Sequence, residues 1–235
     1  IRTRSWNDAA RTMALDLADF ASIRAFAAAV LDQFDRLDVL VLNAGLVLAH
    51  RTETAQGFET TFGVNHLGHF LLAQLLSDRL QESAPSRVVV LASGAHRMAL
   101  RGLNFADLQS ARRYRAFEVY SKSKLANVLF TRELARRLEG TGVTANCAHP
   151  GYVDSHFGRD GDYGFEGFQR LGARFFAISP EQGARTSVYL ASGPELTTAT
   201  GGYYSKSKLA KPSKAARSDA SAARLWNESV TLVAN

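Results

Sequence analysis

The chain has 235 residues and a formal net charge of +6 at neutral pH. Hydrophobic residues make up 46% and charged residues 21%, which is typical of a folded globular domain and argues against a disordered chain. The sequence has no run of about 18 apolar residues, so it predicts no membrane-spanning helix. Its basic residues are scattered, and without a basic cluster the sequence does not indicate a nucleic-acid-binding protein.

The cysteine and histidine content argues against a disulfide and against a metal site. The single cysteine, Cys147, lies in an apolar stretch, cannot form an internal disulfide and suits a reducing compartment. The histidines His66, His69, His96 and His149 are dispersed, without cysteine or carboxylate partners at metal-ligand spacing. We expect a buried structural thiol and no metal.

Helices and strands are predicted to alternate along the chain. The first helix, residues 21–34, follows Asp19, which is a good N-cap residue, and places apolar side chains on one stripe. Residues 37–42 then form a short apolar run, residues 58–80 a long amphipathic stretch and residues 86–92 a second apolar run. Both runs are apolar at odd and even positions, which is typical of strands covered on both faces of a parallel sheet.

The alternation continues in the second half. Residues 117–138 predict a long helix and residues 143–148 a third strand. Ser179 and Pro180 are a good cap and first residue for another helix, and residues 218–232 predict the last one. Repeated strand–helix alternation without a linker or long-period repeat predicts an α/β fold with right-handed crossovers in a single domain.

Residues 154–178 differ from the rest because glycines are interleaved with aromatic residues. The aromatic side chains are Phe157, Tyr163, Phe165, Phe168, Phe175 and Phe176. A loop of this size in a compact domain is usually functional, so we predict a mobile, apolar substrate flap. The alternative is a surface insertion without a function.

Tyr120 and Lys124 are the first candidates for chemistry. Because they are four residues apart on a predicted helix, they lie on the same face. An ammonium beside a phenol favours the phenolate and lowers a pKa that is otherwise about 10, so that the phenol can act as acid or base. The pattern is weak by itself, since Tyr and Lys are common on helix surfaces.

The heptapeptide Tyr-Ser-Lys-Ser-Lys-Leu-Ala occurs at residues 120–126 and again at residues 204–210. The first copy continues into the apolar pattern of the helix 117–138, whereas the second follows two glycines and is interrupted by Pro212. We therefore predict that only the first copy holds its Tyr and Lys on a packed helix. The second copy is predicted to be a solvated basic loop.

Further motifs stand in a fixed order around this pair. They are Asn43-Ala-Gly after a strand, Asn65-His-Leu-Gly-His on a helix, and Ser93-Gly-Ala-His and His149-Pro-Gly-Tyr-Val after two strands. Their order and spacing resemble the short-chain dehydrogenase/reductases, and the long separation between Ser93 and Tyr120 is similar to the retinol-dehydrogenase-like branch. The resemblance covers nearly the whole chain from Ala14 onward. It implies a doubly wound, Rossmann-like parallel sheet and an NAD(P)-dependent oxidoreductase.

The resemblance implies four catalytic residues. Tyr120 matches the general acid/base, and Lys124 matches the residue that lowers its pKa and binds the nicotinamide ribose. Ser93 matches the hydroxyl that hydrogen-bonds the substrate oxygen, and Asn65 the helix-kinking residue that anchors a proton-relay water to Lys124. The alternatives are a strand-end turn serine for Ser93 and a buried backbone-capping amide for Asn65.

The resemblance also implies a nicotinamide cofactor, NADP or NAD, with NADP favoured. Asp16, followed by Leu17, matches an acidic position that contacts adenine, and residues 43–45 match the loop beside the adenine ribose. The turn after the third strand matches the residues that hold the nicotinamide ring. Besides Tyr120 and Lys124, the implied cofactor-binding residues are Asp16, Leu17, Asn43, Ala44, Gly45, Pro150, Gly151, Val153 and Ser155, the last in place of the family's usual Thr.

The sequence departs from the family pattern at its start. The pyrophosphate-binding motif T-G-x-x-x-G-x-G and the strand that chooses between NAD and NADP do not occur in residues 1–235. The single domain therefore lacks its first strand–helix–strand unit in this sequence. We expect that these residues, roughly 30 or more, precede Ile1 in the folded protein.

The sequence thus predicts an oxidoreductase that transfers a hydride between a nicotinamide cofactor and a lipophilic alcohol or carbonyl substrate. Two alternatives stay open, a non-catalytic Rossmann-fold binding or scaffold protein and a reductase of a carbon–carbon double bond. We further expect a cytoplasmic protein without membrane insertion or a nucleic-acid partner. A homodimer is expected through the long helices near residues 66–82 and 118–138.

Overall fold

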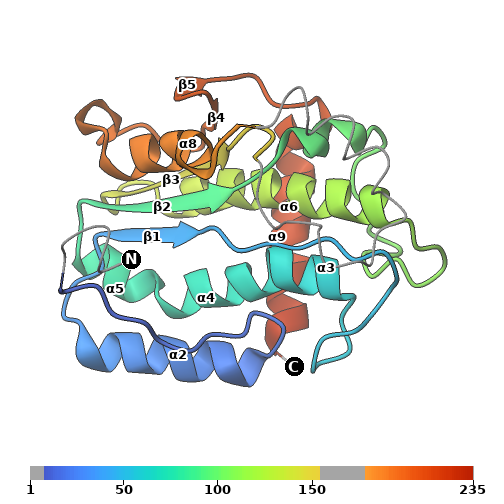
Figure 1. The fold of residues 1–235 in the computed structure, drawn as a ribbon, viewed down its shortest axis with the longest axis horizontal. Helices are drawn as coiled ribbons and strands as arrows, with labels where there is room; N and C mark the ends of the chain where they lie inside the picture. Colours follow the sequence, from blue (N-terminus) through green and yellow to red (C-terminus); the bar gives the residue numbers. More distant parts are fainter. Residues whose placement is uncertain (1–7, 154–177, 235) are drawn as a thin grey trace.

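The computed structural model of the protein describes residues 8–153 and 178–234 (Figure 1). Its α-helices are α2 (Phe20–Gln33), α3 (Thr60–Phe62), α4 (His69–Leu75), α5 (Ser77–Glu82), α6 (Ala116–Arg137), α8 (Pro180–Ser192) and α9 (Asp219–Ala234). A π-helical segment, η1 (Gly63–Gly68), joins α3 to α4, and the 3-10 helices are η2 (Gly94–Met98), η3 (Pro194–Leu196) and η4 (Ala215–Arg217). The strands are β1 (Val39–Leu42), β2 (Ser86–Leu91), β3 (Val143–His149), β4 (Tyr203–Ser205) and β5 (Lys208–Leu209).

These strands form one sheet in the order β1-β2-β3-β4-β5. Strands β1 to β4 run parallel, and β5 pairs antiparallel with β4. The chain passes through α3, η1, α4 and α5 between β1 and β2, through α6 between β2 and β3, and through α8 between β3 and β4. This topology confirms the predicted α/β fold with a parallel sheet.

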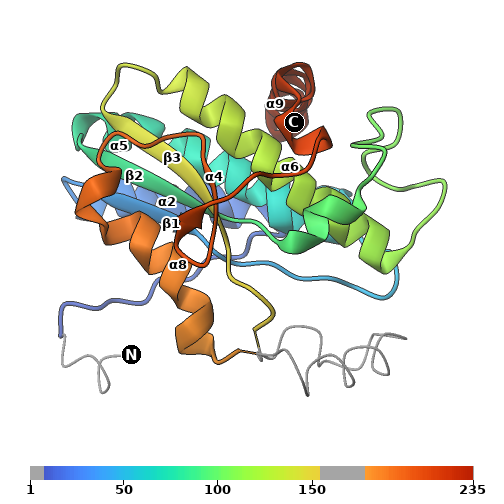
Figure 2. The same ribbon diagram turned by 90° about the horizontal axis from the view of Figure 1, so that it is seen from above.

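Helices cover both faces of the sheet, and Figure 2 shows α8 on one side of the strands and α6 and α9 on the other. Val88 and Val90 of β2 belong to a large apolar core with residues of α2, α4, α6 and α9. Val89, which points the other way, packs in a smaller cluster with Leu190 of α8. Both sides of β2 are therefore buried, which explains why the sequence is apolar at odd and even positions.

The predicted helix over residues 58–80 is divided in the structure into α3, η1, α4 and α5. The π-helical η1 inserts a wider turn into the helical run. At its end, a Cβ on Gly68 would lie 2.6 Å from the carbonyl oxygen of Leu17, so glycine lets the helix approach that loop. At Leu76 the backbone leaves the helical region (φ −99°, ψ 1°), and this separates α4 from α5.

The second copy of the heptapeptide, residues 204–210, forms the β4–β5 hairpin instead of the predicted loop. Its turn residues Lys206 and Ser207 have φ values of 52° and 56°. Consecutive positive φ angles are typical of the tight turns that join hairpin strands, because their twist matches that of the sheet. Lys206 and Lys208 are exposed, so the predicted solvation of these basic side chains is confirmed.

Two local predictions are also confirmed. The hydroxyl of Ser179 accepts a hydrogen bond from the N–H of Gln182, and the Gln182 side chain accepts one from the N–H of Ser179. This reciprocal capping box, with Pro180 at the first helical position, begins α8 as predicted. Cys147 is a free, buried thiol in β3.

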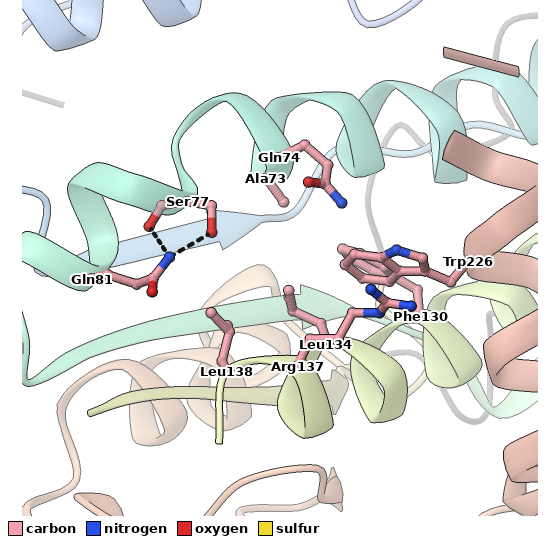
Figure 3. A pocket seen from close by; sticks show the side chains of 9 residues that line it. All are labelled: Ala73, Gln74, Ser77, Gln81, Phe130, Leu134, Arg137, Leu138 and Trp226. Carbon is pink, nitrogen blue, oxygen red and sulfur yellow. Dashed lines mark hydrogen bonds between the residues drawn. The ribbon is translucent and has the colours of Figure 1, made fainter. Parts of the chain in front are cut away.

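Helix α9 packs against α6 on the outer side of the large core (Figure 1). The ring of Trp226 lies 5.0 Å from that of Phe70, edge to face, and 6.0 Å from that of Phe130. A cavity of about 190 Å³ remains between α4, α5, α6 and α9, with Trp226 and Phe130 at one end and Ser77 and Gln81 at the other (Figure 3). Helix α9 thus covers part of the face through which we expect a homodimer, and the homodimer stays a prediction.

Candidate active site

The predicted site residues gather at the carboxyl ends of the parallel strands. β1 ends at Leu42, directly before Asn43, β2 ends two residues before Ser93, and β3 ends directly before Pro150. Ligands of open α/β sheets bind at this edge, where the loops after neighbouring strands converge. Asn43 and Ala44 are exposed and Ser93 is partly exposed, so a ligand can reach this edge from solvent.

Helix α6 places Tyr120 against Ser93. Burial raises the pKa of Tyr120 above its ordinary value of 10.0, and a hydrogen bond with the Ser93 side chain lowers it by less. The predicted net lowering of this pKa by Lys124 is not found, because Nζ lies 5.8 Å from the centroid of the ring and burial dominates. The phenol is therefore protonated at neutral pH.

Lys124 lies one helical turn further along α6 and is only 2% exposed. Its Nζ donates to the carbonyl oxygen of Leu91 at the end of β2 over 3.2 Å, and Asn127 Nδ2 donates to the same oxygen over 3.1 Å. Burial lowers the pKa of Lys124 from 10.5 to about 8. An ammonium with a pKa in this range can release and take up a proton under physiological conditions.

Asn65, in η1, connects the loop after β1 to α6. Its Oδ1 accepts from the N–H of Leu46 over 2.8 Å, and its Nδ2 donates to the Leu46 carbonyl over 2.8 Å and to Ser123 Oγ over 2.9 Å. Ser123 in turn donates to the carbonyl oxygen of Tyr120 over 2.8 Å. The amide therefore holds the turn of α6 that carries both Tyr120 and Lys124.

Ser123 and two backbone carbonyls belong to the site without having been predicted. Ser123 stands beside Lys124 in the repeated heptapeptide, so its position was visible in the sequence but its partner was not. The backbone carbonyl groups of Leu46 and Leu91 could not be predicted from residue type, because every residue has one. Only the fold places the Leu46 carbonyl beside Asn65 and the Leu91 carbonyl beside Lys124.

Gly45 leaves a space open beside Lys124 and Asn65. A Cβ on Gly45 would lie 3.1 Å from Lys124 Nζ and 3.2 Å from Asn65 Oδ1. The glycine thus keeps a cradle with an ammonium donor and an amide acceptor, and such groups fit the hydroxyls of a nucleotide sugar. The predicted cofactor-binding role of this loop is compatible with its geometry.

We expect Gly45→Ala to lower kcat/KM roughly tenfold or more, because the added methyl group displaces Lys124 or Asn65 by a few tenths of an ångström. Nucleotide affinity, measured by fluorescence titration, should fall with it. The melting temperature should change little, since the methyl group faces the cradle and not the core. Unchanged kinetics and affinity would show that nothing binds in this cradle.

Asp16 and Leu17 lie in the turn before α2. Asp16 Oδ1 accepts from the N–H of Ala18 over 2.8 Å, and the N–H of Asp16 donates to Ser22 Oγ over 2.9 Å. Asp16 is exposed and Leu17 is buried. Their hydrogen bonds and burial account for this turn locally, and their contact with an adenine ring stays a prediction.

The turn after β3 is shaped by glycine. Gly151 has a φ of +92°, and a Cβ there would lie 2.9 Å from Ile178 Cδ1. Val153 forms an isolated β-bridge with Ile178 and packs so closely on α8 that a Cβ on Gly183 would lie 2.4 Å from its Cγ2. Since β3 pairs with β2, Pro150 and this turn lie at the same edge of the sheet as Ser93.

Two predictions fall outside the residues that the structure describes. Ser155 and the six aromatic residues of the predicted flap all lie within residues 154–177. Ile178, where the predicted flap ends, is described, and its N–H donates to the carbonyl oxygen of Tyr152 over 2.8 Å.

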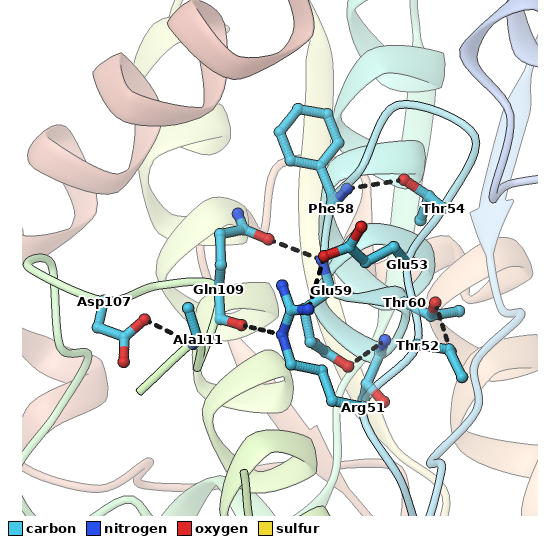
Figure 4. Close-up of polar contacts among 11 residues, drawn as sticks. Arg51, Thr52, Glu53, Thr54, Phe58, Glu59, Thr60, Asp107, Gln109 and Ala111 are labelled. Atoms are coloured by element: carbon cyan, nitrogen blue, oxygen red, sulfur yellow. Dashed lines mark hydrogen bonds and ion pairs between the residues drawn. The ribbon is translucent and has the colours of Figure 1, made fainter. Parts of the chain in front are cut away.

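The segment before α6 is held against the loop that precedes α3 (Figure 4). Gln109 Oε1 accepts from the N–H of Glu59 over 2.8 Å, and the Gln109 carbonyl accepts from Arg51 Nε over 3.2 Å. The carboxylate of Glu59 is buried and accepts from two N–H groups of the first turn of α3, each over 2.7 Å. These bonds anchor the start of the helical run that carries Asn65.

The described residues form neither a metal site nor a membrane-spanning helix. In residues 8–153 and 178–234, no group of three or more His, Cys, Asp and Glu side chains could hold a metal ion. None of the described helices is long and apolar enough to cross a membrane. The cavity of Figure 3 is lined by none of the predicted site residues. The cytoplasmic location, which the single cysteine supports, stays a prediction.

Ser93, which follows β2, and Tyr120 and Lys124 of α6 lie together at the carboxyl edge of a parallel α/β sheet, the edge at which folds of this class bind their ligands. Residues 2–161 match the family model of the short chain dehydrogenases. The chain therefore belongs to the short-chain dehydrogenase/reductase family, as predicted.

Individual relatives show to which branch of the family the chain is similar. Retinol dehydrogenase 12 of Mus musculus is 47% identical over 233 residues, which are 99% of this chain and 72% of that protein. The crystal structure of an uncharacterized protein from Mycobacterium Paratuberculosis is 35% identical with a TM-score of 0.72, over 94% of this chain and 74% of the other. A blue fluorescent protein from a metagenomic library, solved in complex with NADPH, is 26% identical with a TM-score of 0.60, over 81% and 72% of the two chains. The chain is an NAD(P)-dependent oxidoreductase of the retinol-dehydrogenase-like branch.

Proposed function

We propose that this protein interconverts a lipophilic alcohol and its carbonyl compound, with Tyr120 as general acid and base. The supporting observation is the hydrogen bond between Ser93 and Tyr120 at the carboxyl edge of the sheet, one helical turn from the buried Lys124. A phenol, a hydroxyl and an ammonium group in one place suit proton transfer to a substrate oxygen.

In the reducing direction, a bound NAD(P)H would supply the hydride that the carbonyl carbon accepts. Tyr120 donates its proton to the carbonyl oxygen, and Ser93 stabilises the charge that develops on this oxygen by hydrogen bonding. Tyr120 carries this proton at neutral pH, but burial raises its pKa and so makes it a weaker acid than a solvated phenol. Lys124, whose pKa is lowered to about 8, supplies the proton that restores the phenol and takes up one from solvent in its place, and in oxidation each proton moves in the opposite direction.

For the cofactor we propose a preference for NADP over NAD. Three similar proteins of 25–26% identity were solved with NADP or NADPH, and the resemblance of the sequence to the retinol-dehydrogenase-like branch implies the same choice. Comparison of kcat/KM for NADPH and NADH with one carbonyl substrate tests this preference, and a higher value for NADH contradicts it.

The lipophilic nature of the substrate is supported by the aromatic residues within 154–177 and by the names of the similar retinol dehydrogenases. The test is a panel of NADPH-dependent reductions of a long polyene aldehyde, a steroid-like ketone, a medium-chain aldehyde and small charged ketones. We expect the lipophilic compounds to be reduced with kcat/KM at least about tenfold higher, since each buried methylene adds to binding. Turnover of the small charged ketones alone would overturn the proposal.

The same panel separates the two alternatives. NMR of the products distinguishes an alcohol, which we expect, from a saturated carbonyl compound, which a reductase of carbon–carbon double bonds would form. Nucleotide binding without any turnover would indicate a binding or scaffold protein.

A further inference from the structure

The peptide unit that follows Ser93 is hydrogen-bonded on both of its polar groups to histidine side chains. The carbonyl oxygen of Ser93 accepts from His96 Nδ1 over 2.6 Å. The N–H of Gly94 donates to His149 Nδ1 over 3.1 Å. His96 lies in η2 and His149 ends β3, so two different elements hold one peptide plane.

The partners of the two imidazoles determine their tautomers. A carbonyl oxygen can only accept and an amide N–H can only donate, so His96 carries its proton on Nδ1 and His149 does not. His96 Nε2 is then free to accept from the N–H of Ser213 over 3.1 Å. Both rings must be neutral for these bonds to form, and burial lowers the pKa of each below its ordinary value of 6.5.

Close packing keeps both rings in place. The ring of Tyr203, in β4, lies 4.9 Å from that of His96, edge to face, and 6.5 Å from that of His149, nearly parallel. A Cβ on Gly94 would lie 3.1 Å from His149 Nε2, so a larger residue would press on the imidazole where it meets the peptide. His96 is fully buried.

We propose that His96 and His149 are positioning residues that clamp the Ser93–Gly94 peptide plane and thereby aim the Ser93 hydroxyl at Tyr120. Strand β2 fixes the chain before Ser93, and the plane after it sets the ψ of Ser93 (154°). With both sides fixed, the direction of the Cα–Cβ bond is fixed as well. The rotation of the hydroxyl about this bond is held by the N–H of Ala95, which donates to Ser93 Oγ over 3.2 Å. The inference rests on the proposed role of Ser93 in the reaction.

The histidines offer matched variants for the test. In His149→Asn the amide oxygen takes the place of Nδ1 and can still accept from Gly94, whereas His149→Ala removes the acceptor. In the same way His96→Asn retains a donor to Ser93, and His96→Ala does not. Should the alanine variants not fold, His96→Gln fills the space, with its amide near the position of Nε2 and away from Ser93.

The readouts are kcat, KM, nucleotide affinity and melting temperature of the purified protein. We expect His96→Ala and His96→Gln to lower kcat roughly ten- to a hundredfold, with KM and nucleotide affinity within about twofold, because these variants disturb the reacting hydroxyl and not the cofactor turn. His149→Ala should lower kcat by a similar factor and nucleotide affinity as well, because His149 Nδ1 also accepts from the N–H of Gly151 over 3.4 Å. The asparagine variants should recover most of kcat. If the histidines only stabilised the fold, the variants would lower the melting temperature, and the asparagine variants would not recover kcat selectively.

A double-mutant cycle with Ser93→Ala separates this inference from the proposed function. Once the hydroxyl is absent, we expect His96→Ala or His149→Ala to cause no further loss of kcat. Losses that multiply, or histidine variants that are fully active while Ser93→Ala is not, would overturn the clamp. A fully active Ser93→Ala would instead overturn the proposed role of Ser93, and the clamp with it.

Discussion

Replacement of Tyr120 by phenylalanine is expected to reduce kcat by about 10²–10⁴-fold while nucleotide affinity stays within a few-fold. The phenylalanine ring fills the same space and loses only the hydroxyl that meets Ser93. The proton for the substrate oxygen then has no donor, whereas the contacts of α6 with the sheet are retained. Initial rates with NADPH, together with fluorescence titration of the nucleotide, test both parts.

The chain contains its own control for this experiment. Tyr204 occupies the same place in the second copy of the heptapeptide and is also buried, but it lies in the β4–β5 hairpin. Tyr204→Phe should leave kcat nearly unchanged. Lys124→Met should lower kcat and nucleotide affinity, whereas Lys208→Met, at the matching position of the second copy, should change neither. If Tyr120→Phe remains active, another group is the acid and the proposed mechanism is wrong.

The two copies also show how far a local pattern predicts structure. The same seven residues form part of a helix in one place and a hairpin in the other. The flanking sequence decides, because apolar residues continue at helical spacing after the first copy, whereas glycines and Pro212 surround the second. Context therefore correctly placed the first copy on a helix, α6, although the two-residue turn at Lys206 in the second copy was not foreseen.

The sequence predicted the strands and the edge of the sheet better than the contacts made there. Runs that are apolar at both odd and even positions located β1, β2 and β3. The carboxyl ends of these strands lie at one edge of the sheet, where Asn43, Ser93 and Pro150 follow them. The balance of effects on the Tyr120 pKa could not be predicted, because it depends on burial and on the distance to Lys124. Burial and distance are properties of the packed fold and leave no local pattern.

The backbone groups of the site were invisible for a related reason. Asn65 bonds with the N–H and the carbonyl of Leu46, and any residue except proline at position 46 would offer the same groups. His96 and His149 stood out as family motifs, yet their partners are the carbonyl of Ser93 and the N–H of Gly94. The residue type identifies the side chain that can form such a hydrogen bond, but it does not identify the backbone group that is its partner.

Mild acid is expected to destabilise the fold strongly, because two histidines, His66 and His69, are buried in the core. Burial, with the repulsion of His69, lowers the pKa of His66 from 6.5 to about 3. Burial, with the repulsion of Lys124, lowers that of His69 from 6.5 to about 4. His66 Nε2 bonds with Ser229 Oγ of α9 over 2.8 Å, and His69 Nδ1 donates to the carbonyl of Asn65 over 3.2 Å.

The sign follows from proton binding. Between about pH 4 and pH 6.5 the unfolded chain binds a proton on each histidine and the native state does not, so the free energy of unfolding falls as the pH falls. Each group contributes about 1.4 kcal/mol per pH unit, and the two together lower the stability by roughly 5 kcal/mol between pH 6.5 and pH 4.5. Native domains are typically stable by about 5–15 kcal/mol, so this loss is large enough to unfold the protein.

Urea unfolding at a series of pH values measures this slope directly. The variant His66→Gln/His69→Asn keeps polar groups near Ser229 and near the Asn65 carbonyl but cannot titrate, so the slope between pH 4.5 and pH 6.5 should flatten. His50→Gln removes an exposed histidine and should leave the slope unchanged. A slope that persists in the double variant would place the acid sensitivity elsewhere, with His96 and His149 the next candidates because burial also lowers their pKa values. Unfolding in mild acid would then begin at the Ser93 turn and reduce kcat before the core opens, whereas titration of His66 and His69 should lower stability and activity together.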